Sequence, residues 1–224
     1  MLKQKTTTTR NRFTSADLDF LASVLVPGEQ RPHVEKLWTD PDALRGMLDL
    51  PEVFRSLLNS PETLRISPRF YFYILVRHAF LQANLRAPEV ADYVSDVMTR
   101  SVSPAHRDPL CDVARGFTHA SEFIAFINRA QGRMRFHLQV AAGNQFLMLA
   151  GLYPGFLSGR RAQSGAQDPG FYQNFAQQAF RDAAASPHAP SPAARTTLAH
   201  LAESLPLAIR SLNRVADEYV FLGD

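Results

Sequence analysis

The sequence predicts an all-α protein, built as a single irregular multi-helix domain around a buried central helix. Strand signals are poor, because no segment alternates apolar and polar residues between two turns and no Asn-Gly or Asp-Gly dipeptide marks a hairpin. A second observation is that proline repeatedly follows a polar or small residue. A third is the stretch 133–153, whose apolar residues point in most directions. Together these features favour helices throughout the chain.

Proline marks the starts of most predicted helices. It suits the first helical position because its missing N–H is not needed there, and the residue before it can act as the N-cap. The pattern occurs at Asp40-Pro41, Ser60-Pro61, Ser67-Pro68, Ser103-Pro104, Asp168-Pro169 and Ser191-Pro192, with Leu50-Pro51 and Ala87-Pro88 as weaker versions. It predicts helices over 41–49, 51–59, 61–65, 68–85 and 88–101, and a short helix is also expected at 33–38.

Residues 1–12 are predicted to be a flexible basic arm that precedes the folded domain, 13–224. This segment carries Lys and Arg around a run of threonines and contains no acid. The first helix follows it, with Thr14 or Ser15 as the N-cap and a leucine-rich stripe that ends at Pro27.

The central helix is predicted over about 133–153. Its apolar residues are not confined to one stripe, which indicates a helix buried on most sides. These residues are Phe136, Leu138, Val140, Phe146, Leu147, Met148, Leu149 and Leu152. Gly132 separates this helix from a preceding one over 120–129. The segment 101–119 is expected to be a connector, since two prolines and Gly116 interrupt it.

The last third of the chain is also predicted to be helical. The Gly, Ser and Gln residues of 158–167 indicate a loop, and a helix is expected over 169–185. The proline-rich segment 186–192 is typical of a stiff linker. Two closing helices, 192–204 and 206–221, complete the prediction.

The composition fits a soluble globular protein. A chain of 224 residues with 46% hydrophobic and 20% charged residues can bury one sizeable core. Cys111 is the single cysteine, so no internal disulfide is possible, and no apolar segment follows the basic N-terminus. Cytoplasmic residence is therefore expected. The apolar window 136–157 is long enough to span a membrane, but its polar residues argue against a membrane span.

An acid-free block that holds five arginines is the first candidate site. No Asp or Glu occurs in 123–167, and the arginines within it are Arg129, Arg133, Arg135, Arg160 and Arg161. The first three surround the start of the central helix, where backbone N–H groups add partial positive charge. An anionic partner could bind there. The alternative is that these arginines are solvated or pair with acids of other helices.

Polar residues inside the central helix are the second candidate. Arg133, His137 and Asn144 lie close to one line of the helix, because steps of four and eleven residues return to nearly the same face. Buried polar groups require hydrogen bonds. Either neighbouring helices supply the partners or the stripe lines a pocket for a ligand or water.

Arg77 and His78 belong to the same question, because they lie deep inside the aromatic-rich helix 68–85. Arg77 is expected to pair with an acid such as Asp92 or Asp96. His78 could meet His137 as a pair of haem or metal ligands, although a lone histidine on an apolar face is more often a hydrogen-bonded core residue. A pocket would lie between the central helix and the helix 68–85.

No complete metal, nucleotide or nucleophile motif occurs. His119 and Glu122 form one His/Glu pair without a second copy. The negative charge of Asp108 and Asp112 opposes a reactive thiolate at Cys111. We therefore predict no metal, no cofactor and no catalytic residue.

The sequence thus favours a non-catalytic binding or regulatory protein. Its expected partner is an anionic macromolecule, either nucleic acid or an acidic protein surface, which engages the arginine clusters. The alternative is a small-molecule-binding protein or enzyme that uses the pocket described above. The sequence does not indicate an oligomeric state.

Overall fold

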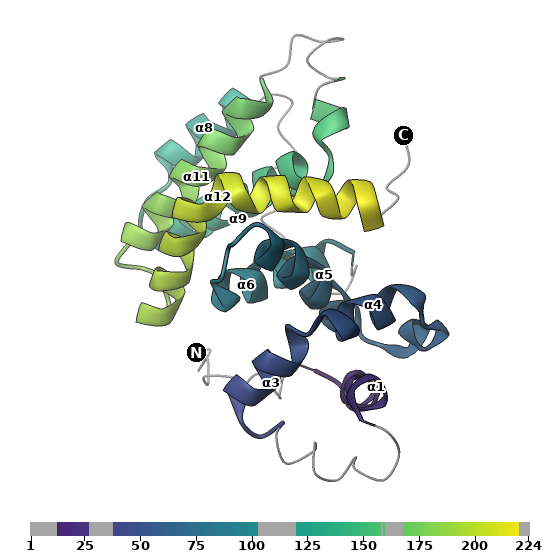
Figure 1. The fold of residues 1–224 in the computed structure, drawn as a ribbon. Helices are drawn as coiled ribbons and strands as arrows, with labels where there is room; N and C mark the ends of the chain where they lie inside the picture. Colours follow the sequence, from purple (N-terminus) through teal and green to yellow (C-terminus); the bar gives the residue numbers. More distant parts are fainter. Residues whose placement is uncertain (1–12, 27–37, 103–119, 158, 160–167, 220–224) are drawn as a thin grey trace. The chain divides into compact units, whose positions relative to one another are not determined.

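The structure is a computed structural model that describes residues 13–26, 38–102, 120–157, 159 and 168–219. Within these ranges it contains helices and no strand, which confirms the all-α prediction (Figure 1). The chain divides into two compact units, Met1–His78 and Ala79–Asp224. The expected single domain stays a prediction.

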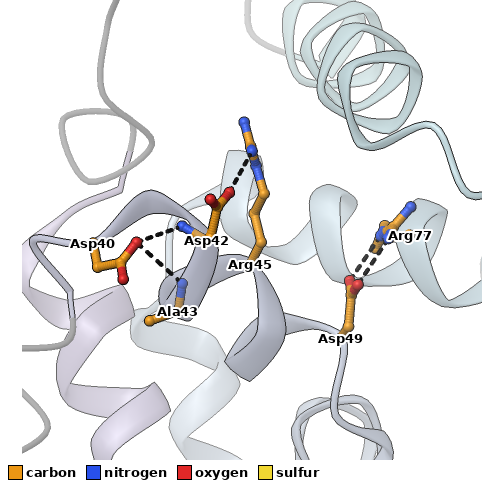
Figure 2. Close-up of polar contacts among 6 residues, drawn as sticks. All are labelled: Asp40, Asp42, Ala43, Arg45, Asp49 and Arg77. Carbon is orange, nitrogen blue, oxygen red and sulfur yellow. Dashed lines mark hydrogen bonds and ion pairs between the residues drawn. The ribbon is translucent and has the colours of Figure 1, made fainter.

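The described part of the first unit contains four elements and the start of a fifth. These are α1 (Ser15–Leu25), α3 (Pro41–Leu48), α4 (Pro51–Asn59), the 3-10 helix η3 (Pro61–Arg65) and α5 (Pro68–Gln82). All except α1 begin at a proline that the sequence marked as a helix start. At α3, Asp40 acts as the N-cap and accepts hydrogen bonds from the N–H groups of Asp42 and Ala43 (Figure 2).

Asp17 joins the starts of α1 and α5. Its carboxylate closes a capping box with Thr14, whose N–H donates to it at 2.7 Å. The N–H and the hydroxyl of Ser67 donate to the same carboxylate at 2.6 Å and 2.7 Å. Ser67 directly precedes α5, so one fully buried acid orders two helix N-termini. The sequence predicted the cap of α1 but not this second use of Asp17.

The described part of the second unit contains further long helices. These are α6 (Pro88–Val102), α8 (Ala120–Arg129), α9 (Gly132–Leu152), α11 (Pro169–Ala185) and α12 (Pro192–Tyr219). Helix α9 packs against α8, α11 and α12 (Figure 1). It is the helix predicted over 133–153. Most of its residues from Phe136 onward are buried, whereas its first turn is exposed.

Two glycines set the close packing on α9. A Cβ atom added at Gly143 would lie 2.7 Å from the ring of Phe180 on α11, and one at Gly151 would lie 2.8 Å from Leu212 on α12. Real Cβ atoms essentially never approach so closely. The absence of side chains at these two positions therefore lets α11 and α12 lie close to the backbone of α9.

Helix α12 corrects the prediction of two closing helices. A break between 204 and 206 was expected, but the structure has one continuous helix with Pro206 inside it. Proline lacks the N–H that would bond to the carbonyl of Ala202, four residues earlier. Nε2 of Gln177 on α11 donates to that carbonyl at 2.8 Å. A donor from a neighbouring helix thus replaces the missing helical one.

Helix α5 ends before the predicted residue 85. Asn84 adopts a left-handed conformation with φ 60°, and the N–H of Leu85 then reaches back to the carbonyl of Phe80 at 2.8 Å. This geometry is a common helix stop, and asparagine tolerates it better than most residues.

Several sequence predictions lie outside the described residues. They concern the basic arm 1–12, most of the short helix 33–38, the connector up to residue 119 and nearly all of the loop 158–167. Among the residues that the structure does describe, no helix combines the length and the apolar character that crossing a membrane requires.

Candidate functional site

Three of the predicted arginines lie at the junction of α8 and α9. Arg129 is the last residue of α8, and Arg133 and Arg135 lie in the first turn of α9. Only Ala130 and Gln131 separate the two helices, so the local chain path keeps the three arginines in one region. All three side chains are exposed.

The start of α9 adds positive potential to this region. Its N-cap, Gln131, makes no side-chain hydrogen bond to the helix, and its first turn contains no acid. The N–H groups of a first turn have no helical acceptors and carry the positive end of the helix dipole. Neither a cap side chain nor an acid of the first turn offsets that charge at α9.

The arginines of the junction form no ion pair within the described part of the chain, unlike Arg45, Arg55 and Arg214. Elsewhere, Arg45 pairs with Asp42, Arg55 with Glu52 and Arg214 with Glu218, each three or four residues away. Arg129, Arg133 and Arg135 have no acid three or four residues away, because they lie in the acid-free block. In the described residues, therefore, the expected alternative of pairing with acids of other helices is not found for these three side chains.

A groove opens beside Arg135. Its volume is about 400 Å³, and it is lined by Gly132, Arg135, Phe136, Gln139, Asp182, Ala185, Ser186, Pro187 and His188. We call it the α9–α11 groove. The His188 ring lies over the start of α9, since a Cβ atom added at Gly132 would be 3.7 Å from its Nε2. Gly132 has φ +58°, a conformation that favours glycine.

Asp182 supplies the negative charge of the groove. One of its carboxylate oxygens accepts a hydrogen bond from Gln178 at 2.6 Å, and the other accepts a longer one from Gln139 at 3.4 Å. The groove thus presents an arginine, a histidine and a hydrogen-bonded carboxylate beside the apolar surfaces of Phe136 and Pro187.

The polar stripe predicted along α9 is divided by the structure. Arg133 lies in the exposed first turn, and His137 is exposed although its neighbours Phe136 and Leu138 are buried. Asn144 is buried, and its side-chain oxygen accepts a hydrogen bond from the hydroxyl of Tyr93 at 2.8 Å. The neighbouring helix α6 therefore provides a hydrogen-bond partner for Asn144, which agrees with the alternative that neighbouring helices satisfy the buried polar groups.

Arg77 is buried and ion-paired, as expected, but with an acid that the sequence did not indicate. Its Nε and one terminal nitrogen each donate to a different oxygen of Asp49 at 2.7 Å (Figure 2). Asp49 is the C-cap residue of α3, 28 positions earlier. Such a bidentate pair fixes the orientation of both side chains. The sequence carries no signal for it, since the expected acids lay on the helix that follows.

His78 stacks on Phe54, with ring centroids 3.6 Å apart and an interplanar angle of 6°. Both residues lie in the first unit, whereas His137 and Asn144 lie in the second. A pocket between α9 and α5 therefore stays a prediction. In the ranges that the structure describes, no group of three or more His, Cys, Asp or Glu residues could hold a metal ion.

Two parts of the predicted site lie outside the described residues. Arg160 and Arg161 fall in the gap that precedes α11, and Cys111 falls in the gap that precedes α8. The contribution of residues 182–188 to the groove was not predicted, since the sequence indicated only a helix end and a linker there. Only the tertiary contact of α11 with α9 brings those residues to the junction.

Comparison with known proteins gives no match: no protein-family model fits the chain, and no curated protein or solved structure matches it. The function is therefore argued from the residues of the chain itself.

Proposed function

We propose that the protein is a non-catalytic helical binding protein that engages an anionic macromolecule through Arg129, Arg133 and Arg135. The observation that supports this most strongly is the absence, within the described residues, of any acid paired with these three exposed arginines. Arg160 and Arg161, outside those residues, remain part of the proposed set.

The physical reason is that these guanidinium groups are available for bidentate contact. Arginine presents a planar set of donors that matches carboxylate and phosphate, and a charge-assisted hydrogen bond is stronger than a neutral one. An arginine already paired with an acid would have to break that pair before binding. The first turn of α9 adds N–H groups that favour an anion in the same place.

The same surface suits either nucleic acid or an acidic protein. Both kinds of partner carry several anionic oxygens along their surface, so several arginines can each contact one. A positively charged region of this kind also speeds the encounter with an anionic partner, because it steers diffusion at low salt.

A comparison of variants on an immobilised polyanion tests the proposal. The natural chain and the Arg129→Gln/Arg133→Gln/Arg135→Gln variant are applied to heparin and to polyglutamate and eluted with salt. We expect the variant to elute at lower salt from both. Arg210→Gln on α12 is the matched control, since Arg210 is also exposed and is not among the residues of the junction. Elution of the triple variant together with the control and the natural chain would disprove the proposal.

A further inference from the structure

Exposed apolar side chains lie among the arginines of the junction. Met134, between Arg133 and Arg135, is 55% exposed, and Phe126, one turn before Arg129, is 41% exposed. By contrast, Ile127 and Phe136, which are large apolar residues of the same two helices, are buried. We call Phe126, Arg129, Arg133 and Met134 the junction ridge.

The α9–α11 groove starts from the same turn of α9, because Gly132 and Arg135 line it. Its volume of about 400 Å³ falls near the lower end of the range for ligand pockets, roughly 300–1,000 Å³. It can therefore take a side chain or two of a partner. Asp182 opposes the entry of an acidic group, whereas Phe136 and Pro187 offer apolar contact.

We infer that the ridge and the groove together form a docking surface for an acidic segment of another protein. The segment places carboxylates against Arg129 and Arg133 and an uncharged, apolar side chain in the α9–α11 groove. This inference rests on the proposed function, of which it names the partner class.

The residue types of the surface favour a protein over a nucleic acid. Phenylalanine, methionine and arginine are enriched in the cores of protein interfaces, and affinity there depends on a few anchors that fill pockets. Proteins that bind single strands instead use several aromatic residues in series along a basic groove. The junction ridge offers one aromatic residue, and the carboxylate of Asp182 repels phosphate.

A peptide selection on the full chain tests the inference. A displayed library of random peptides is first depleted on the Arg129→Gln/Arg133→Gln/Arg135→Gln variant and then selected on the natural chain. We expect the recovered peptides to be rich in Asp and Glu and to share an apolar residue. Recovery of no binder, or of binders without acids, overturns the inference.

Variants of the surface then separate apolar docking from charge alone. A recovered peptide is synthesised with a fluorophore, and its affinity is measured by anisotropy. We expect Met134→Ser on the ridge, and Ala185→Trp, which fills the groove, each to weaken binding about tenfold or more, as is typical of interface hot spots. Val102→Ser changes another exposed apolar residue, on α6, and should have no effect. Circular dichroism and thermal unfolding establish that each variant is folded.

The outcomes distinguish the inference from the proposed function. If the arginine variant loses the peptide but Met134→Ser and Ala185→Trp retain it, charge alone binds and the inference fails while the proposed function stands. If the arginine variant binds heparin and polyglutamate as tightly as the natural chain does, the proposed function and the inference that rests on it both fail. A single-stranded DNA that binds more tightly than the peptide, and that loses affinity on Met134→Ser, overturns the assignment to a protein partner.

Discussion

Gln177 and Ala202 are joined by a hydrogen bond of 2.8 Å, which supplies the donor that Pro206 removes from helix α12. The bond crosses from α11 to α12, so a side chain of one helix completes the backbone of the other. This explains how a proline can lie in the interior of a 28-residue helix without ending it.

Gln177→Leu is expected to destabilise the protein through this bond. Ala202 is 2% exposed, and a buried carbonyl without a donor costs about 1–3 kcal/mol. Pro206→Ala restores the N–H, so the loss caused by Gln177→Leu should shrink in that background. Urea unfolding of the four combinations measures the coupling. If Gln177→Leu lowers stability equally in the natural chain and in the Pro206→Ala background, the Gln177 side chain does not compensate for the missing N–H at Pro206.

Gly143→Ala is expected to destabilise by about 1–3 kcal/mol, because its new methyl group would overlap the Phe180 ring. The larger Gly143→Leu change should be at least as harmful. Gly46→Ala in α3 is the matched control, since nothing lies within 4 Å of a Cβ atom there. That change should stabilise by up to about 1 kcal/mol through helix propensity. Thermal unfolding decides, and a rise in Tm for both substitutions would contradict the close approach of α9 and α11.

The ion pair of Arg77 and Asp49 predicts non-additive substitutions. The side chains are 8% and 27% exposed, so removing one partner leaves a largely buried charge and should destabilise by about 2–4 kcal/mol, somewhat below the value for a fully buried pair. The double variant Arg77→Met/Asp49→Leu should be less destabilised than the sum of the two single variants. Arg45→Gln, in a pair whose partner Asp42 is 89% exposed, should change stability by less than about 1 kcal/mol. Additive losses at Arg77 and Asp49 would refute the pairing.

Asp17→Ala should destabilise by at least about 2 kcal/mol, since it removes an N-cap contact of α1 and leaves the buried donors of Ser67 without an acceptor. Denaturant unfolding measures the loss. Asp42→Ala is the control, because Asp42 is an exposed first-turn acid of α3. A loss at Asp17 no greater than at Asp42 would be inconsistent with the network that joins α1 and α5.

Local chemistry accounts for the parts of the fold that could be predicted. Every described proline that follows a predicted cap does begin a helix, because the fixed φ of proline and the capping side chain act within a few residues. Pro206 follows Leu205, which is not one of those caps, and α12 continues past it because the missing donor is supplied by Gln177, which is remote in sequence.

The same distinction applies to the candidate site. The junction arginines were predictable, since the acid-free block and the start of a helix are both local features. The α9–α11 groove and the pairing of Arg77 with Asp49 were not, because each depends on which helices pack together.

The central claim is that the junction arginines bind anions, and the salt dependence of binding tests it most directly. A fluorescent single-stranded DNA serves as a polyanion, and its affinity is titrated at several salt concentrations, beginning near 50 mM, where even non-specific phosphate contacts are favoured. Deletion of residues 1–12 separates the contribution of the basic arm, and Arg210→Gln is the control.

We expect Arg133→Gln/Arg135→Gln to flatten the slope of log affinity against log salt by about one to two units, since each neutralised phosphate of a single strand contributes about 0.7. The Arg210→Gln slope should equal that of the natural chain. Equal slopes for the double variant and the natural chain would contradict the claim that these arginines form an anion-binding site, whereas absence of binding near 50 mM salt would exclude nucleic acid as the partner.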